Sequence, residues 1–297
     1  MKIFRIILLL TVIIIINSCQ CDKKKSTSEN QSTNQNDDSG FNNDSGFQDV
    51  YYRFPSPEEM LNVINEDGLN FNADLIAPIQ SVDNFVNSKS QALNMGVYIA
   101  DMAYITIFKR HKESIKYLQT IYKLSDKLRI SAAFDPKLMM RIENNLNNVD
   151  TLRAISDEAY TDISNYLEKY DKEKVFAVIS IGGYIESLYV ALHLIDKFDP
   201  NDIIVQRISD QKLVLNNLIN YAKAYEDDNN VKEALDMIQP IKECFDELGM
   251  KESSTSVKQS KDGKIILSGG NRIVITENQF DKLRSETVKI RTSILTN

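Results

Sequence analysis

The sequence has few of the residues that build common catalytic and metal sites. It contains only two histidines, His111 and His193, and neither has a second histidine or cysteine at the spacing of a metal ligand. It also lacks a glycine-rich phosphate loop, an HExxH helix, a paired CxxC and a GxSxG nucleophile turn. We therefore expect no transition-metal site, no cofactor and no catalytic residue of these kinds.

Cysteine and clustered positive charge are also scarce. The three cysteines cannot form a disulfide framework, because Cys19 and Cys21 lie at the N-terminus and Cys244 stands alone in a helical stretch, where it should be a small buried hydrophobic residue. The formal net charge is -7, and the one basic block is residues 23–25. Binding to phosphate backbones needs a concentrated basic face, so nucleic acid is not an expected partner.

The N-terminus has the pattern of an export signal. Two positive charges in residues 1–5 precede a nearly pure apolar run, residues 6–16, which ends in Ile16-Asn17-Ser18-Cys19. As a helix this run rises only about 16 Å, against about 30 Å of bilayer hydrocarbon, so it predicts a signal peptide and not a membrane-spanning helix. The ending resembles the lipobox of bacterial lipoproteins, with Asn17 as a departure. An ordinary secretory signal that ends near a cysteine is the alternative.

The lipobox resemblance implies cleavage before Cys19, lipidation of Cys19 and anchoring to a membrane. Gln20 is not the Asp that retains lipoproteins in the inner membrane of enteric bacteria, and no acidic run typical of surface export in some Bacteroidetes follows it. The expected location is therefore the cell envelope, on the periplasmic face of the outer membrane. The expected partners are the membrane and an envelope protein.

Composition divides the chain into four regions. Residues 1–18 are the predicted signal peptide, and residues 19–50, rich in Ser, Asn, Gln, Asp and Gly, are a flexible tether that should reach about 30 Å. Residues 51–250 form a helical domain. Residues 251–297 contain a polar loop, a β-hairpin and a C-terminal helix, which we expect to pack on the helical domain.

Capping signals and apolar spacing predict about eight helices between residues 56 and 249. The predicted N-terminal caps are Ser56, Asp135, Asp150, Asp171 and Asp199. Pro78 and Pro240 should break or kink their helices. Residues 92–108 and 175–194 are apolar nearly all round, which is typical of the central pair of a bundle. The predicted fold is mostly α, a multi-helix bundle with a C-terminal β-hairpin and a final helix.

The C-terminal region predicts the hairpin and the final helix. Residues 264–267 and 272–275 are β-prone and flank Ser268-Gly269-Gly270-Asn271, which has turn chemistry. Thr276-Glu277-Asn278-Gln279 should cap a helix that runs to about Ile294. A lone hairpin is marginally stable, so its apolar residues should dock on the bundle or, alternatively, on a partner.

One polar constellation lies within the two apolar segments. It consists of Tyr98, Asp101, Tyr104, Glu186, Tyr189 and His193. The first three follow at steps of three, the last three share a second helical face, and Gly182 and Gly183 permit close backbone approach. Carboxylates within such helices must be paired or hydrogen-bonded. They predict either a buried network that fixes how the two helices pair, or a pocket that binds a cation or ligand or acts as acid and base.

Short motifs along the chain resemble a family of uncharacterised helical lipoproteins in Bacteroidetes. They are Phe54-Pro55-Ser56-Pro57-Glu58, residues 93–98 with Asp101 and Tyr104, and Gly182-Gly183-Tyr184. The resemblance runs from Tyr51 to the C-terminus and implies location and fold, with no catalytic residues to transfer. The expected function is an anchored scaffold or binding module. The alternative is a small-ligand receptor or hydrolytic enzyme that uses Asp101 and Glu186.

Overall fold

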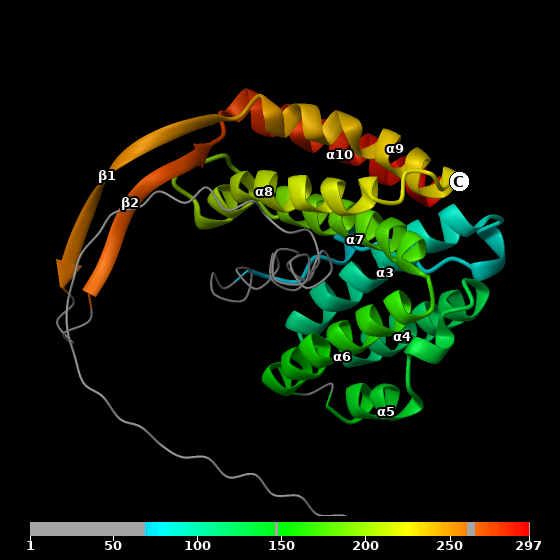
Figure 1. The fold of residues 1–297 in the computed structure, drawn as a ribbon. Coiled ribbons are helices and arrows are strands. Elements are labelled where there is room, and N and C mark those ends of the chain that lie inside the picture. Colours follow the sequence, from blue (N-terminus) through cyan, green and yellow to red (C-terminus); the bar gives the residue numbers. More distant parts are fainter. Residues whose placement is uncertain (1–68, 146–147, 260–264, 297) are drawn as a thin grey trace, which may run out of the picture. The chain divides into compact units, whose positions relative to one another are not determined.

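Helices dominate the computed structural model, which describes residues 69–145, 148–259 and 265–296 (Figure 1). The predicted fold class is confirmed, with eight α-helices and one two-stranded antiparallel sheet in these residues. The helices are α3 (Ser88–Ile107), α4 (His111–Lys127), α5 (Pro136–Asn145), α6 (Val149–Lys169), α7 (Glu173–His193), α8 (Ile203–Lys223), α9 (Asn229–Asp246) and α10 (Glu277–Thr296), and the strands are β1 (Gly249–Gln259) and β2 (Ile265–Val274). The lipobox, the tether and the helix predicted from Ser56 lie outside the described residues.

Helices α3 and α7 form the centre of the bundle, as their apolar sequences predicted. They pack on each other more extensively than any other pair of described helices, with α4 against α3 and α8, α9 and α10 around α7. Two glycines set this close approach: a Cβ on Gly96 would lie 2.0 Å from the Ile179 carbonyl oxygen, and one on Gly182 would lie 2.1 Å from the Leu93 carbonyl oxygen. A side chain at either position would push the two backbones apart.

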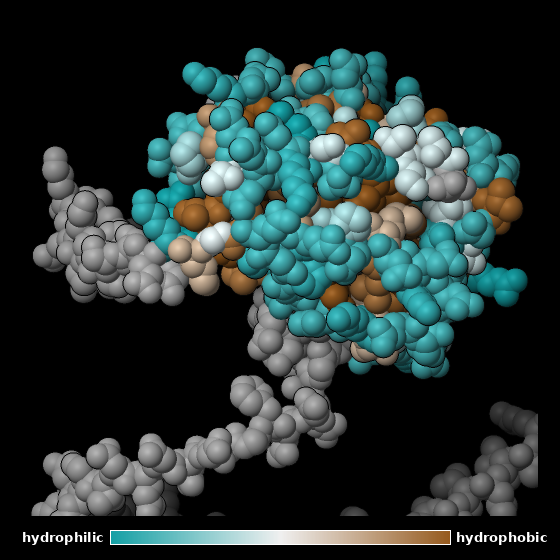
Figure 2. All heavy atoms as spheres, turned by 90° about the horizontal axis from the view of Figure 1, so that it is seen from above, coloured by the Kyte–Doolittle hydropathy of each residue, from teal (hydrophilic) through white to brown (hydrophobic). Residues whose placement is uncertain are grey.

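The central position of α7 also accounts for its composition. It is the one helix among the described residues that is long and apolar enough to cross a membrane, but 89% of its most apolar window is buried inside the fold. The face of the molecule in Figure 2 is mostly hydrophilic, with hydrophobic side chains in small patches. Cys244 is buried in α9, as predicted.

A non-helical segment before α3 lies against the helices, and we name residues 69–87 the N-terminal strap. It contains two short 3-10 turns, η2 (Ala73–Leu75) and η3 (Val82–Asn84), and is otherwise irregular. Leu75, Ala77 and Phe85 are buried in the core of the bundle. Pro78 lies in this strap and in no helix, so the prediction that it breaks or kinks a helix was wrong. Helix α9 continues through Pro240.

Two of the predicted helix starts are confirmed. Helix α5 begins at Pro136, and the Asp135 carboxylate accepts the Lys137 N–H at 2.8 Å. Helix α10 begins after a reciprocal capping box: the Gln279 side chain accepts the Thr276 N–H at 3.0 Å, and the Thr276 hydroxyl accepts the Gln279 N–H at 3.4 Å.

Three predicted caps were wrong, by one to three residues. Helix α6 is capped by Asn148, so Asp150 falls inside it. Asp202 caps α8, and Asp199 instead closes the turn before it by accepting the Asn201 N–H. Asp171 adopts a left-handed conformation with φ 54° in the turn before α7. Asp and Asn stabilise turns and caps through the same local hydrogen bonds, so sequence alone did not separate the two.

The C-terminal hairpin exists, but its turn is not at the glycine pair. Strand β1 takes in residues predicted to be a polar loop and pairs with β2, with Ser253 opposite Gly270 and Ser256 opposite Ser268. The register shifts between these two pairs, and glycine suits such an irregularity as well as it suits a turn. The C-terminal end of β2 packs on the bundle, where Ile273 and, just after the strand, Ile275 are buried.

Candidate functional site

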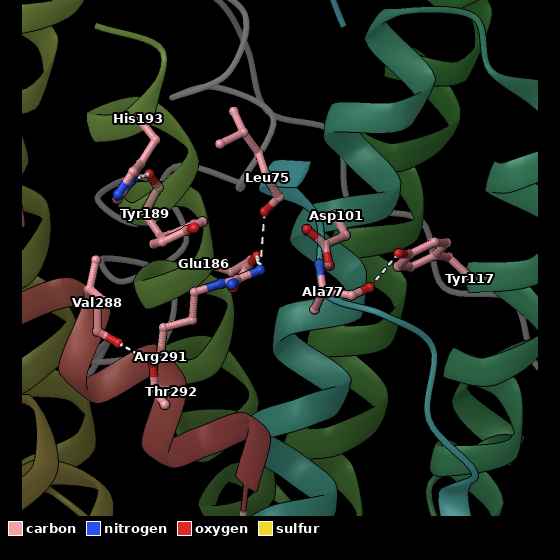
Figure 3. A network of polar contacts seen from close by, with 10 residues as sticks. All are labelled: Leu75, Ala77, Asp101, Tyr117, Glu186, Tyr189, His193, Val288, Arg291 and Thr292. Atoms are coloured by element: carbon pink, nitrogen blue, oxygen red, sulfur yellow. Dashed lines mark hydrogen bonds and ion pairs between the residues drawn. The ribbon is translucent and has the colours of Figure 1, made fainter. Parts of the chain in front are cut away.

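The structure places the two predicted carboxylates at the centre of the bundle. Asp101 on α3 and Glu186 on α7 both have 0% of their surface exposed. They lie on the central helix pair (Figure 3), close enough that the charge of Glu186 raises the pKa of Asp101. The acidic groups of the two stripes therefore lie together in one buried cluster.

The cation that balances Glu186 comes from the final helix. Arg291 on α10 donates from Nε to Glu186 Oε2 and from Nη2 to Glu186 Oε1, both at 2.7 Å. Its Nη2 also donates to the Leu75 carbonyl oxygen at 3.0 Å, and its guanidinium lies 3.9 Å from the centre of the Tyr189 ring. Such a planar, two-pronged pair is among the strongest polar contacts in proteins. It occupies both oxygens of Glu186.

Other polar side chains of the cluster bind main-chain groups of the N-terminal strap. Asp101 Oδ2 accepts the Ala77 N–H at 2.9 Å, and the Tyr117 hydroxyl on α4 donates to the Ala77 carbonyl oxygen. The Tyr104 hydroxyl accepts the Asn72 N–H at 3.0 Å. A buried irregular segment must find such partners, because water cannot reach its backbone.

Tyr98 holds the next part of the strap. Its hydroxyl donates to the Pro78 carbonyl oxygen at 3.3 Å and accepts the Gln80 N–H at 3.1 Å. The Gln80 side chain in turn donates to the Leu295 carbonyl oxygen on α10 at 2.9 Å. The strap is thus held by side chains of α3, α4 and α10 and by one main-chain group of α10.

The surroundings shift the pKa values of the Asp101 and Glu186 carboxyls to different extents. Burial raises the pKa of Asp101 well above its usual value, and the charge of Glu186 raises it further, whereas the Ala77 N–H and Arg291 lower it by less. Burial also raises the pKa of Glu186, but its hydrogen bonds to Arg291 oppose this. The pairing with Arg291 therefore favours the charged form of Glu186 more than the surroundings favour the charged form of Asp101.

Tyr189 and His193 lie at the half-buried edge of the cluster. Their ring centres are 4.1 Å apart, and His193 Nδ1 lies 2.7 Å from the Tyr189 carbonyl oxygen. Burial lowers the pKa of His193, the hydrogen bond to the Tyr189 carbonyl opposes this, and the positive charges of Arg284 and Arg291 lower it further. The surroundings of His193 therefore favour its neutral form beside the cation that pairs with Glu186.

Sequence reasoning missed Arg291, Tyr117 and the strap. The signal for Arg291 was present, because two buried carboxylates need a cation and Arg284 and Arg291 stand seven residues apart beside the apolar face of the final helix. Arg284 serves another purpose: it donates to the Leu192 and Ile195 carbonyl oxygens at 2.8 and 2.7 Å, at the C-terminal end of α7.

The fold and the site define a mostly helical bundle built around a buried, charge-paired polar cluster. Within the residues that the structure describes, no group of three or more His, Cys, Asp or Glu side chains lies close enough to hold a metal ion. Comparisons with protein-family models, with curated proteins and with solved structures gave no match.

Proposed function

We propose that this chain is a membrane-anchored envelope lipoprotein whose helical domain acts as a scaffold or binding module and not as an enzyme. The proposal that the domain is not an enzyme rests on one observation: the polar groups of the cluster bind one another and the main chain of the strap. Arg291 takes both oxygens of Glu186, and Asp101 and Tyr117 hold Ala77 of the strap. A catalytic or ligand-binding group must be able to exchange its partners for substrate, and these buried groups are committed to holding the fold.

The anchored location rests on the sequence. Ile16-Asn17-Ser18-Cys19 has the lipobox pattern, and the polar composition of residues 19–50 suits a tether between lipid and domain. The resemblance to helical lipoproteins of Bacteroidetes agrees with the periplasmic face of the outer membrane. In this proposal the domain stands off the membrane and meets an envelope protein.

The anchor is tested by a pair of cysteine substitutions. Cys19→Ala should abolish labelling by a fatty-acid probe and move the protein from the membrane to the soluble fraction. Cys21→Ala is the matched control and should change neither. Labelling that survives in Cys19→Ala would overturn the proposed anchor.

The choice between scaffold and ligand site is tested by thermal melting of the full chain with a panel of metabolites and metal ions. Glu186→Gln is the comparison variant, because it alters the carboxylate at the centre of the cluster. The proposal expects no member of the panel to raise the melting temperature of the wild type selectively. A compound that stabilises the wild type but not Glu186→Gln would show that the cluster is a binding site.

A further inference from the structure

Among the residues that the structure describes, the buried cluster contains two carboxyl groups, Asp101 and Glu186, but one cation, Arg291. Arg291 donates from Nε and Nη2 to the two oxygens of Glu186. Its Nη2 also donates to the Leu75 carbonyl oxygen. Asp101 has a donor at Oδ2, the Ala77 N–H, whereas its buried Oδ1 has no hydrogen-bond partner among the described residues. The described structure therefore leaves one buried oxygen unsatisfied beside a carboxylate.

Among the described residues, the groups around Asp101 cannot neutralise a second negative charge. Its ionisable neighbours are Glu186 on α7, Arg291 on α10, Tyr98 and Tyr104 on α3, and Tyr117 on α4. The phenols stay neutral, because burial raises the pKa of each of the three tyrosines. The strap contributes a main-chain N–H to Asp101. An unpaired carboxylate with no exposed surface is very costly, so this environment favours the neutral, protonated form of Asp101.

We propose that Asp101 keeps its proton at neutral pH, donates it from Oδ1 to the Glu186 carboxylate, and so couples the docking of the N-terminal strap to pH. With the proton in place, the cluster holds one negative and one positive charge and is neutral. The same carboxyl then donates from Oδ1 to Glu186 and accepts from Ala77 at Oδ2. One protonated side chain thereby joins α3, α7 and the strap.

Loss of the proton would place two negative carboxylates face to face. Water or a cation would have to enter between α3, α7 and the strap to relieve this repulsion. The two helices are held by direct backbone contact at Gly96 and Gly182, whereas the strap around Ala77 is held mainly by single side-chain hydrogen bonds. We therefore expect the strap, and not the α3–α7 contact, to detach as pH rises.

Infrared spectroscopy tests for the proton directly. The full chain carrying carbon-13 label in its aspartate carboxyls should show the C=O band of a protonated carboxyl at neutral pH. Asp101→Asn should remove this band. Asp74→Asn, a substitution at an exposed aspartate of the same strap, should leave it in place. A wild-type spectrum without the band, or a band that survives Asp101→Asn, would overturn the proposal.

Amide hydrogen exchange tests the coupling to the strap. The protection of the Ala77 N–H, corrected for the intrinsic effect of pH on exchange, should fall in the wild type as pH rises, by up to about tenfold per pH unit. Asp101→Asn keeps an acceptor for Ala77 and a donor for Glu186 but has no proton to lose, so its corrected protection should not change with pH. Equal pH profiles for Ala77 in the two proteins would refute the coupling.

Discussion

Arg291 on α10 donates hydrogen bonds to both carboxylate oxygens of Glu186 in the central helix α7, each at 2.7 Å. The same guanidinium holds the Leu75 carbonyl oxygen at 3.0 Å, so one side chain joins α10, α7 and the N-terminal strap. Buried charge pairs contribute little net stability, but removing one partner is costly. The pair therefore acts chiefly to specify how three segments distant in the sequence come together.

The glycines between α3 and α7 give a first prediction. Gly96→Ala should lower the free energy of unfolding by about 1–3 kcal/mol or more, because its Cβ would overlap the Ile179 carbonyl and force the helices apart. Gly249→Ala is the control, since its Cβ would first meet Val274 at 3.9 Å, an ordinary contact. Chemical denaturation measures both, and equal losses would contradict the close helix contact.

Two tyrosines of α4, one buried and one at the surface, test whether α4 stabilises the position of the strap. Tyr117→Phe removes the hydroxyl that donates to the buried Ala77 carbonyl, which should cost about 1–3 kcal/mol of unfolding free energy. Tyr122→Phe, at a surface position of the same helix, should change stability by no more than about 0.5 kcal/mol. If urea denaturation gives the same small effect for both, the Tyr117 hydroxyl does not stabilise the strap.

The raised pKa of Asp101 predicts a pH-dependent stability. The folded protein keeps a proton that the unfolded chain loses above about pH 4, so the stability linked to Asp101 is fully present below that pH. It is lost as pH rises towards the folded pKa, by up to about 1.4 kcal/mol per pH unit. Asp101→Asn lacks this dependence, so its stability relative to the wild type should increase with pH. Chemical denaturation at several pH values measures the free energy of unfolding of both proteins. A difference between them that does not change with pH would contradict a raised pKa for Asp101.

Much of the architecture could be predicted from local patterns. The two apolar segments identified the central pair α3 and α7, and Gly182 marked their close contact, because a helix without a polar face must be surrounded by others. The capping box at Thr276 located α10 to the residue. The hairpin turn was misplaced because Gly269-Gly270 is compatible with both a turn and an irregular strand pair.

The site was only half predictable, for a physical reason. The stripes on α3 and α7 identified Asp101 and Glu186 as polar groups in need of partners. Their partners are Arg291, more than a hundred residues further along the chain, and the main chain of Ala77, which carries no side-chain signal. The unequal acidities of the two carboxyls depend on which of them Arg291 reaches, and that is a property of the tertiary fold.

The most direct test of the structural role of the cluster is a double-mutant cycle on Arg291→Met and Glu186→Met, measured by chemical denaturation. Each single substitution leaves a buried charge without its partner and should cost roughly 3–5 kcal/mol. The double substitution leaves no unpaired charge, so its loss should fall short of the sum by about 2 kcal/mol or more. The exposed pair Lys289 and Glu286 on α10 provides the control cycle, with a coupling of about 0.5 kcal/mol or less. Additive losses at Arg291 and Glu186 would contradict the account.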